Sequence, residues 1–97
     1  MSVVFRDEAI SDLDEIARYI GQNNPAAADR VIARIHRVIH RTIDRFPHSG
    51  RLNPANSTRE FAVPGLPYLI IYLPAADVVD IIAIFHTSRD PRAKRQP

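Results

Sequence analysis

The segment VVDIIAIFHTSRD, residues 78–90, provides the frame around which the rest of the chain can be arranged. Its first eight residues are apolar except for Asp80 and rich in β-branched side chains, which is typical of a strand buried between two neighbours. His86, Thr87, Ser88 and Arg89 follow at once, so polar and cationic side chains stand at the end of this strand. We therefore expect the strand inside a sheet and look for function at its end.

Composition narrows the class of protein. The 97 residues, 45% of them hydrophobic, predict a single domain spanning residues 1–97. Cysteine is absent and the four histidines are scattered, so we expect no disulfide, no metal site and no cofactor. No apolar run of about 20 residues and no signal-type N-terminus are found, which predicts a cytoplasmic protein.

The basic residues are strongly skewed toward arginine. The formal net charge is only +2, yet Lys94 is the single lysine among 13 basic residues. Arginine presents a rigid fork that suits carboxylate or phosphate, whereas lysine presents a point charge. The skew fits a partner that bears such anionic groups, or the codon usage of a GC-rich genome, and composition does not separate these explanations.

Residues 2–46 predict a short strand followed by two helices. Residues 2–6 are rich in β-formers. Asp7 is a suitable N-cap and Gly21 a suitable stop for an amphipathic helix, whose Asp12, Asp14 and Glu15 fall outside the apolar arc. Asn24 and Pro25 restart a helix that should continue to about Phe46, before Pro47. The short connection predicts an antiparallel helical hairpin.

The second predicted helix carries a row of arginines. At 100° per residue they fall within about 80° of arc, separate from the apolar side, and they are Arg30, Arg34, Arg37, Arg41 and Arg45. This row could hold an anion. Alternatively it is a solvated surface that is neutralised in part by Asp29, Asp44 and the acidic first helix.

The second half of the chain predicts three strands. Residues 47–57 are rich in Pro, Gly, Asn and Ser and read as a surface loop. Strands are expected near residues 58–63, 68–73 and 78–86, and the connections between them are short enough to require antiparallel hairpins. The predicted fold is therefore α+β, with the helical hairpin packed on an antiparallel sheet in the order β-α-α-β-β-β.

Strand alternation assigns side chains to two faces of this sheet. An apolar set is expected under the helices: Phe61, Val63, Leu69, Ile71, Leu73, Val79, Ile81, Ala83 and Phe85. The other face should carry Glu60 and His86 beside Tyr68, Tyr72, Ile82 and Ile84. That face is too apolar for permanent contact with water, so a partner covers it, unless these are ordinary exposed residues or the register differs.

A set of residues in order along the chain carries a resemblance to a known family. They are Ala9, Asp12-Leu13, Ile16, Tyr19-Ile20, Asn24-Pro25, Ala27-Ala28, Pro47, Gly50-Arg51, Thr58-Arg59-Glu60, Pro67-Tyr68, Ile71-Tyr72, His86 and Arg89-Asp90. This pattern, from about Val3 to Pro91, resembles the ParE branch of the RelE/ParE toxin superfamily. The resemblance implies that the first strand lies next to the last. It also implies a toxin of a type II toxin–antitoxin system, held in a hetero-oligomer by a partly disordered, usually acidic, ParD-like antitoxin.

The resemblance leaves two targets open, with a third reading as a harmless relative kept as a binding module. ParE-like members act on DNA gyrase by binding, and RelE-like members cut messenger RNA on the ribosome. Cleavage would need a base, an acid and cations on the phosphate, and the candidates are Glu60, His86, Arg59, Arg89 and Arg51. The RNA-cutting relatives typically have Lys or Arg on the sheet and an aromatic residue near the C-terminus, and this chain has no aromatic residue after Phe85. We therefore favour a gyrase-binding toxin without catalysis.

Antitoxin binding is expected on the mixed face of the sheet and in the groove beside the helical hairpin. The candidate antitoxin-binding residues are Tyr68, Tyr72, Ile82 and Ile84.

Overall fold

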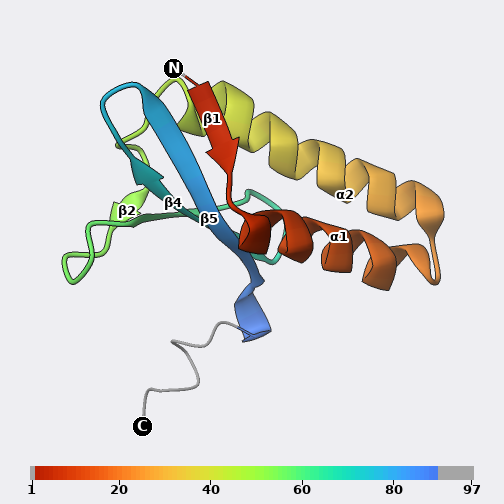
Figure 1. Ribbon diagram of the computed structural model, residues 1–97. Coiled ribbons are helices and arrows are strands. Elements are labelled where there is room, and N and C mark those ends of the chain that lie inside the picture. The colour runs from red at the N-terminus through yellow and green to blue at the C-terminus, as the bar shows by residue number, and fades with distance from the viewer. Residues whose placement is uncertain (1, 90–97) are drawn as a thin grey trace, which may run out of the picture.

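The computed structural model describes residues 2–89, and the side chain of Arg89 lies outside that description (Figure 1). In chain order the elements are β1 (Ser2–Phe5), α1 (Asp7–Gly21), α2 (Pro25–Val38), the π-helical turn η1 (Ile39–Ile43), β2 (Arg51–Leu52), β3 (Arg59–Ala62), β4 (Tyr68–Pro74), β5 (Val78–His86) and the 3-10 turn η2 (Thr87–Arg89). The predicted α+β fold is confirmed. The two-residue strand β2, inside the predicted loop, was not expected.

The sheet has five strands in the order β1-β5-β4-β3-β2. As expected, β5 lies inside it, between the first strand and β4. The sheet is mixed rather than wholly antiparallel, because β1 runs parallel to β5 while the other pairs are antiparallel. A hairpin forces antiparallel pairing, but β1 and β5 are joined through the helices and the other strands, and such a connection leaves either direction open.

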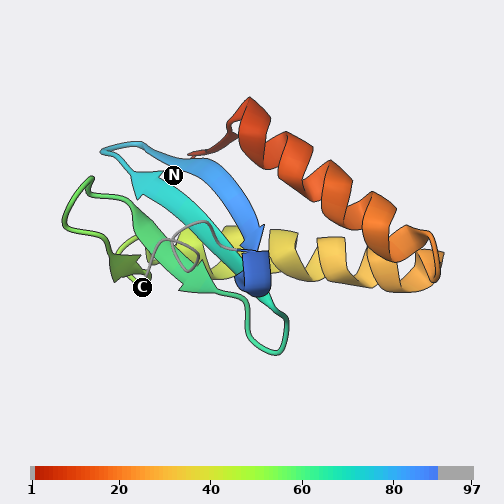
Figure 2. The ribbon, with the colours of Figure 1, turned by 90° about the horizontal axis from the view of Figure 1, so that it is seen from below.

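The two helices form the predicted antiparallel hairpin. Arg6 rather than Asp7 is the N-cap of α1, and Asp7 and Glu8 occupy its first turn, where carboxylates oppose the positive end of the helix dipole. Asn24 caps α2 as predicted: its side chain accepts the backbone N–H of Ala27 at 3.0 Å, and Pro25 follows. Figure 2 shows α2 lying across one face of the sheet, with α1 beside the β1–β5 side.

The second helix changes its winding before it ends. The α-helical geometry stops at Val38 and η1 follows, in which the N–H of Asp44 bonds to the carbonyl of Ile39 at 2.9 Å, five residues back. The chain is therefore helical nearly as far as predicted, but one turn is wider. Ile39 and Ile43 of this turn are fully buried.

The core under the helices differs from the predicted apolar set. Tyr68, Ile70 and Tyr72 of β4 pack with Ile35, Ile39 and Ile43 in one buried cluster. The predicted β4 residues Leu69, Ile71 and Leu73 therefore point to the opposite face, and that assignment was wrong. Pairing explains the error, because Phe61 stands opposite Ile70, and directly opposed residues share a face.

A bulge adds a second change of side. Along β5, Val79 and Ile81 face the helices as predicted, but the register shifts where Ile71 pairs with Ala83 and Tyr72 with Ile81, so Ile82 is the extra residue. Beyond it Ile84, rather than Ala83 or Phe85, joins the core. None of the helices in residues 2–89 is both long and apolar enough to span a membrane.

Candidate functional site

His86 ends β5 and is held by its neighbours. Its Nδ1 accepts the backbone N–H of Ser88 at 3.2 Å and lies 2.7 Å from the Ser88 hydroxyl. The ring meets Tyr68 edge-on, with centroids 5.4 Å apart. Because Nδ1 accepts the backbone N–H, the proton of the neutral imidazole lies on Nε2. These contacts hold the His86 ring where β5 turns into η2.

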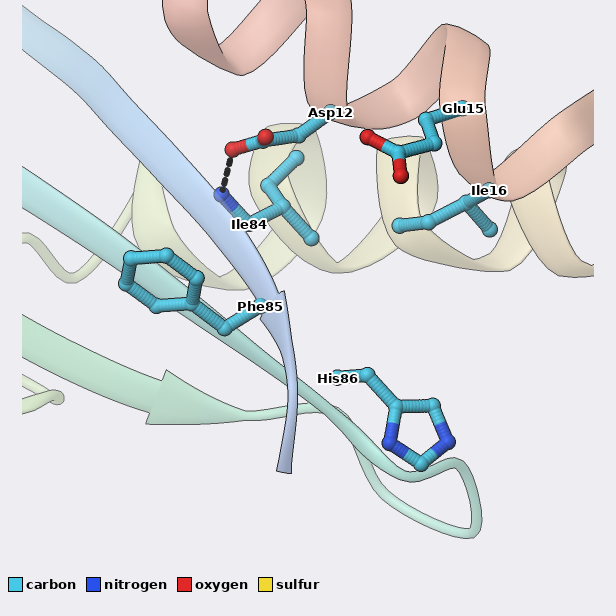
Figure 3. Close-up of a pocket in the computed structure, with 6 residues that line it drawn as sticks. All are labelled: Asp12, Glu15, Ile16, Ile84, Phe85 and His86. Carbon is cyan, nitrogen blue, oxygen red and sulfur yellow. Dashed lines mark hydrogen bonds between the residues drawn. The ribbon is translucent and has the colours of Figure 1, made fainter. Parts of the chain in front are cut away.

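A small cavity of about 150 Å³ lies beside His86, between α1 and β5 (Figure 3). Its lining residues are Asp12, Glu15, Ile16, Ile84, Phe85 and His86. Figure 3 shows Ile84 and His86 extending to one side of β5 and Phe85 to the other. Among the described side chains, the lining offers two carboxylates and one imidazole, which can transfer protons, and no Lys or Arg to hold a phosphate.

Asp12 joins α1 to the edge of β5 beside this cavity. The strand β1 pairs with β5 only as far as Ile81, which leaves the following part of β5 without a strand neighbour on that side. Asp12 Oδ2 accepts the backbone N–H of Ile84 at 2.9 Å and so satisfies this edge. Burial raises the pKa of Asp12, with Glu8 and Glu15 adding to the rise and the Ile84 hydrogen bond opposing it. We assign Asp12 a structural role.

Glu60 and His86 are not brought together. Glu60 stands opposite Ile71, which pairs with Ala83, and both lie on the face away from the helices, whereas His86 pairs with Tyr68 on the helix side. Two strand spacings and three residues along β5 put their Cα atoms about 14 Å apart. The expectation that they share a face was wrong, because the bulge at Ile82 reverses the side of every later residue in β5.

The candidate arginines also hold separate places. Arg59 donates to the carbonyls of Gly50 at 2.8 Å and His48 at 3.2 Å, which fastens the loop before β2. Arg51 is exposed on β2 and stands opposite Glu60. Arg89 ends η2, and its side chain lies outside the described part of the structure. Arg51 and Arg59, whose side chains the structure describes, do not form a phosphate clamp around His86.

Three of the four predicted antitoxin-binding residues are in the core. Tyr68, Tyr72 and Ile84 are 6%, 0% and 3% exposed, and Ile82, the bulge residue, is half-buried. The Tyr72 hydroxyl donates to the carbonyl of Pro47 at 2.8 Å and accepts the N–H of Gly50 at 2.9 Å. The open face that was assigned to them is therefore misplaced, since the described fold gives these three side chains no surface to offer.

The groove beside the helical hairpin is present. It lies between α1 and α2, has a volume of about 740 Å³, and is lined by Phe5, Asp7, Ile10, Ser11, Leu13, Asp14, Ala17, Ile32 and His36. Ile10 is 53% exposed there, so the groove offers a large apolar side chain to a partner. The groove therefore combines an apolar floor with carboxylates from Asp7 and Asp14.

An aromatic cluster borders this groove. His36 and His40 stack with ring centroids 6.0 Å apart, and Phe5 lies 5.6 Å from His36. Burial lowers the pKa of His36, and His40 lowers it further. Sequence reasoning did not single out these residues, although their spacing of four on one helix was the available signal. Within residues 2–89 no three His, Asp or Glu side chains are grouped so as to hold a metal ion.

Comparisons with known proteins agree along the whole fold. Residues 3–91 match the family described as ParE toxin of type II toxin-antitoxin system, parDE. Toxin RelE2 of Caulobacter vibrioides is 37% identical over 87 residues, which are 90% of this chain and 96% of that protein. Y4kP of Sinorhizobium fredii is 40% identical over 78 residues, 80% of this chain and 79% of its own length.

A solved structure shares the fold. A chain from the chromosomal ParDE TA system of P. aeruginosa superposes with a TM-score of 0.76 at 18% sequence identity, covering 89% of this chain and 95% of that one.

Proposed function

The chain belongs to the ParE toxin family of type II toxin–antitoxin systems, and we propose that it inhibits DNA gyrase by binding, without catalysing a reaction. The observation that carries the choice between binding and RNA cleavage is the separation of Glu60 from His86 on opposite faces of the sheet. A general acid and a general base must both reach one substrate, and groups about 14 Å apart across a sheet do not. The proposal places the toxin in the cytoplasm, with gyrase.

The arginines support the same choice. Cleavage also requires cations on the phosphate. Arg59 donates to the carbonyls of His48 and Gly50, and no cationic side chain that the structure describes lines the cavity beside His86. The runner-up, a RelE-like ribonuclease, therefore has no assembled site among the described residues.

We further propose that a ParD-like antitoxin neutralises the toxin in a hetero-oligomer by filling the groove between α1 and α2. The exposed Ile10 and the apolar floor around Leu13 and Ile32 offer burial to a segment that folds as it binds. A helix laid in such a groove uses apolar anchors at a spacing of three and four. This assignment replaces Tyr68, Tyr72 and Ile84, which are buried.

The gyrase proposal is tested by titrating purified toxin into a plasmid supercoiling and cleavage assay with purified gyrase. We expect loss of supercoiling or accumulation of cleaved plasmid, relieved when antitoxin is added first. Folded toxin that leaves gyrase unaffected at every concentration would overturn the proposal and move the search to translating ribosomes.

A further inference from the structure

The outer side of the second helix exposes all five of its arginines. They are Arg30, Arg34 and Arg37 of α2, Arg41 of η1 and Arg45 just after it, and we call them the arginine face. The same helix buries Ile35, Ile39 and Ile43 on its other side. The face is therefore a solvent-facing row about 22 Å long, at 1.5 Å per residue.

The π-helical turn keeps this row straight. With 100° per residue throughout, Arg45 would be rotated by about 60° from Arg30. In η1 the hydrogen bond runs from Asp44 back to Ile39, and the extra residue in the turn reduces the rotation per residue. Arg41 and Arg45 are thereby brought back toward the line of Arg30 and Arg37.

The arginines of the row outnumber the acidic residues of the same helix. Residues 25–46 hold five arginines and two acidic residues, Asp29 and Asp44. Arg34 donates to the carbonyl of Pro64 at 2.8 Å, which leaves its charge intact. Even with partial neutralisation by Asp29 and Asp44, an excess of three arginines remains on this helix, and it can meet an external anion.

The composition of the row selects the kind of anion. The remaining exposed residues of α2 are Pro25, Ala26, Asp29 and Ala33, so α2 presents neither aromatic rings nor large apolar side chains to solvent. Single-stranded nucleic acid is held by base stacking on aromatic residues, and a disordered acidic peptide needs apolar anchors to offset its loss of entropy. Neither is exposed along α2, and the exposed rings near the far end of the row are His40 and Phe46. A phosphate backbone requires only the guanidinium groups.

We infer that the arginine face binds the phosphate backbone of duplex DNA, without sequence preference. A duplex carries one charge per roughly 1.7 Å of axis, so a row of about 22 Å meets enough phosphates for each arginine to pair with one. This activity goes beyond gyrase binding, and it would let the toxin engage DNA and enzyme together.

The test is fluorescence anisotropy of a labelled duplex of about 24 base pairs, with purified toxin and no gyrase, over a series of salt concentrations. Arg37→Gln and Arg41→Gln should each weaken binding about 3- to 10-fold and reduce the slope of log K against log[salt] by about 1. Arg18→Gln is the matched control, because Arg18 is also exposed but lies on α1. It should change neither quantity, and Arg37→Lys should keep the slope.

Several results would overturn the inference: no binding to the duplex at low salt, an equal loss with Arg18→Gln, or loss of antitoxin binding in the Arg37 and Arg41 variants with DNA binding unchanged. Circular dichroism and the melting temperature control for folding, which these exposed side chains should not affect. Because gyrase is absent, failure of DNA binding and failure of gyrase inhibition are read separately.

Discussion

Tyr72 shows how one hydroxyl group organises a loop. It is fully buried, and its hydroxyl joins the carbonyl of Pro47 to the N–H of Gly50 across the loop that follows the helices. The backbone approaches closely here, since a Cβ on Gly50 would lie 2.5 Å from that hydroxyl. A glycine is therefore required at this contact.

We predict that Tyr72→Phe lowers the free energy of unfolding by about 1–3 kcal/mol, because both loop groups lose their partner in a buried place. Urea denaturation measures the change. A variant as stable as the wild type would mean that water replaces the hydroxyl and that the contact contributes nothing net.

Asp12 makes stability depend on pH with a defined sign. Burial raises its pKa above 3.8. The contribution of the protonated Asp12 carboxyl to folding stability is therefore fully present below that value and is lost as pH rises through the folded pKa. Asp12→Asn can still accept the Ile84 N–H but does not ionise. We therefore expect the stability of Asp12→Asn relative to wild type to increase between about pH 3 and pH 7.

The matched control for this prediction is Asp14→Asn, whose side chain is 76% exposed. Its stability relative to wild type should not rise in the same way over this range. If both variants gave the same pH profile, the effect would belong to the net charge of α1 and not to the burial of Asp12. Helical periodicity placed Asp12 outside the apolar arc. It could not indicate that this side chain lies against the edge of β5.

The strands show which structural features an amphipathic pattern can predict. The centre of the sheet at β5 and the capped hairpin at Asn24-Pro25 followed from local signals that the structure confirms. The faces of β4 did not, because residues 68–73 are apolar on both sides and alternation then does not show which side faces the helices. The bulge at Ile82 has no residue signal of its own, yet it moved His86 to the side opposite Glu60.

The role of the groove between α1 and α2 in antitoxin binding can be tested with one substitution. Ile10→Asp places a charge on its apolar floor, so we expect antitoxin affinity to fall by at least about 10-fold, since an unpaired charge is costly to bury. Ile10 is already 53% exposed, and the fold should tolerate the change. Calorimetric titration with the antitoxin measures the affinity.

Phe46→Asp is the control for the groove, because Phe46 is 61% exposed and does not line it. It should retain antitoxin binding. Equal binding by wild type and Ile10→Asp would contradict the assignment and direct attention to the face of the sheet that carries Leu69, Leu73 and Phe85.

At the scale of the whole molecule, the helical hairpin separates charge. Five carboxylates lie on α1, with Arg18 as its single basic residue, while the arginine face occupies the second helix. The chain thus offers an apolar groove with acidic residues and, on the outer side of its second helix, a cationic surface. The net charge of only +2 hides this separation, which the positions of the charged residues along the two helices already indicated.

The central claim is that this toxin acts through its surface and that Glu60 and His86 take no part in a reaction. The most direct measurement compares wild type with the Glu60→Gln/His86→Asn double variant in the gyrase supercoiling assay, with cleavage of messenger RNA on translating ribosomes measured in parallel. We predict equal inhibition of gyrase by the two proteins and no RNA cleavage by either. Wild-type protein that cuts the message and spares gyrase, with the double variant folded, bound by antitoxin and inactive, would contradict the claim.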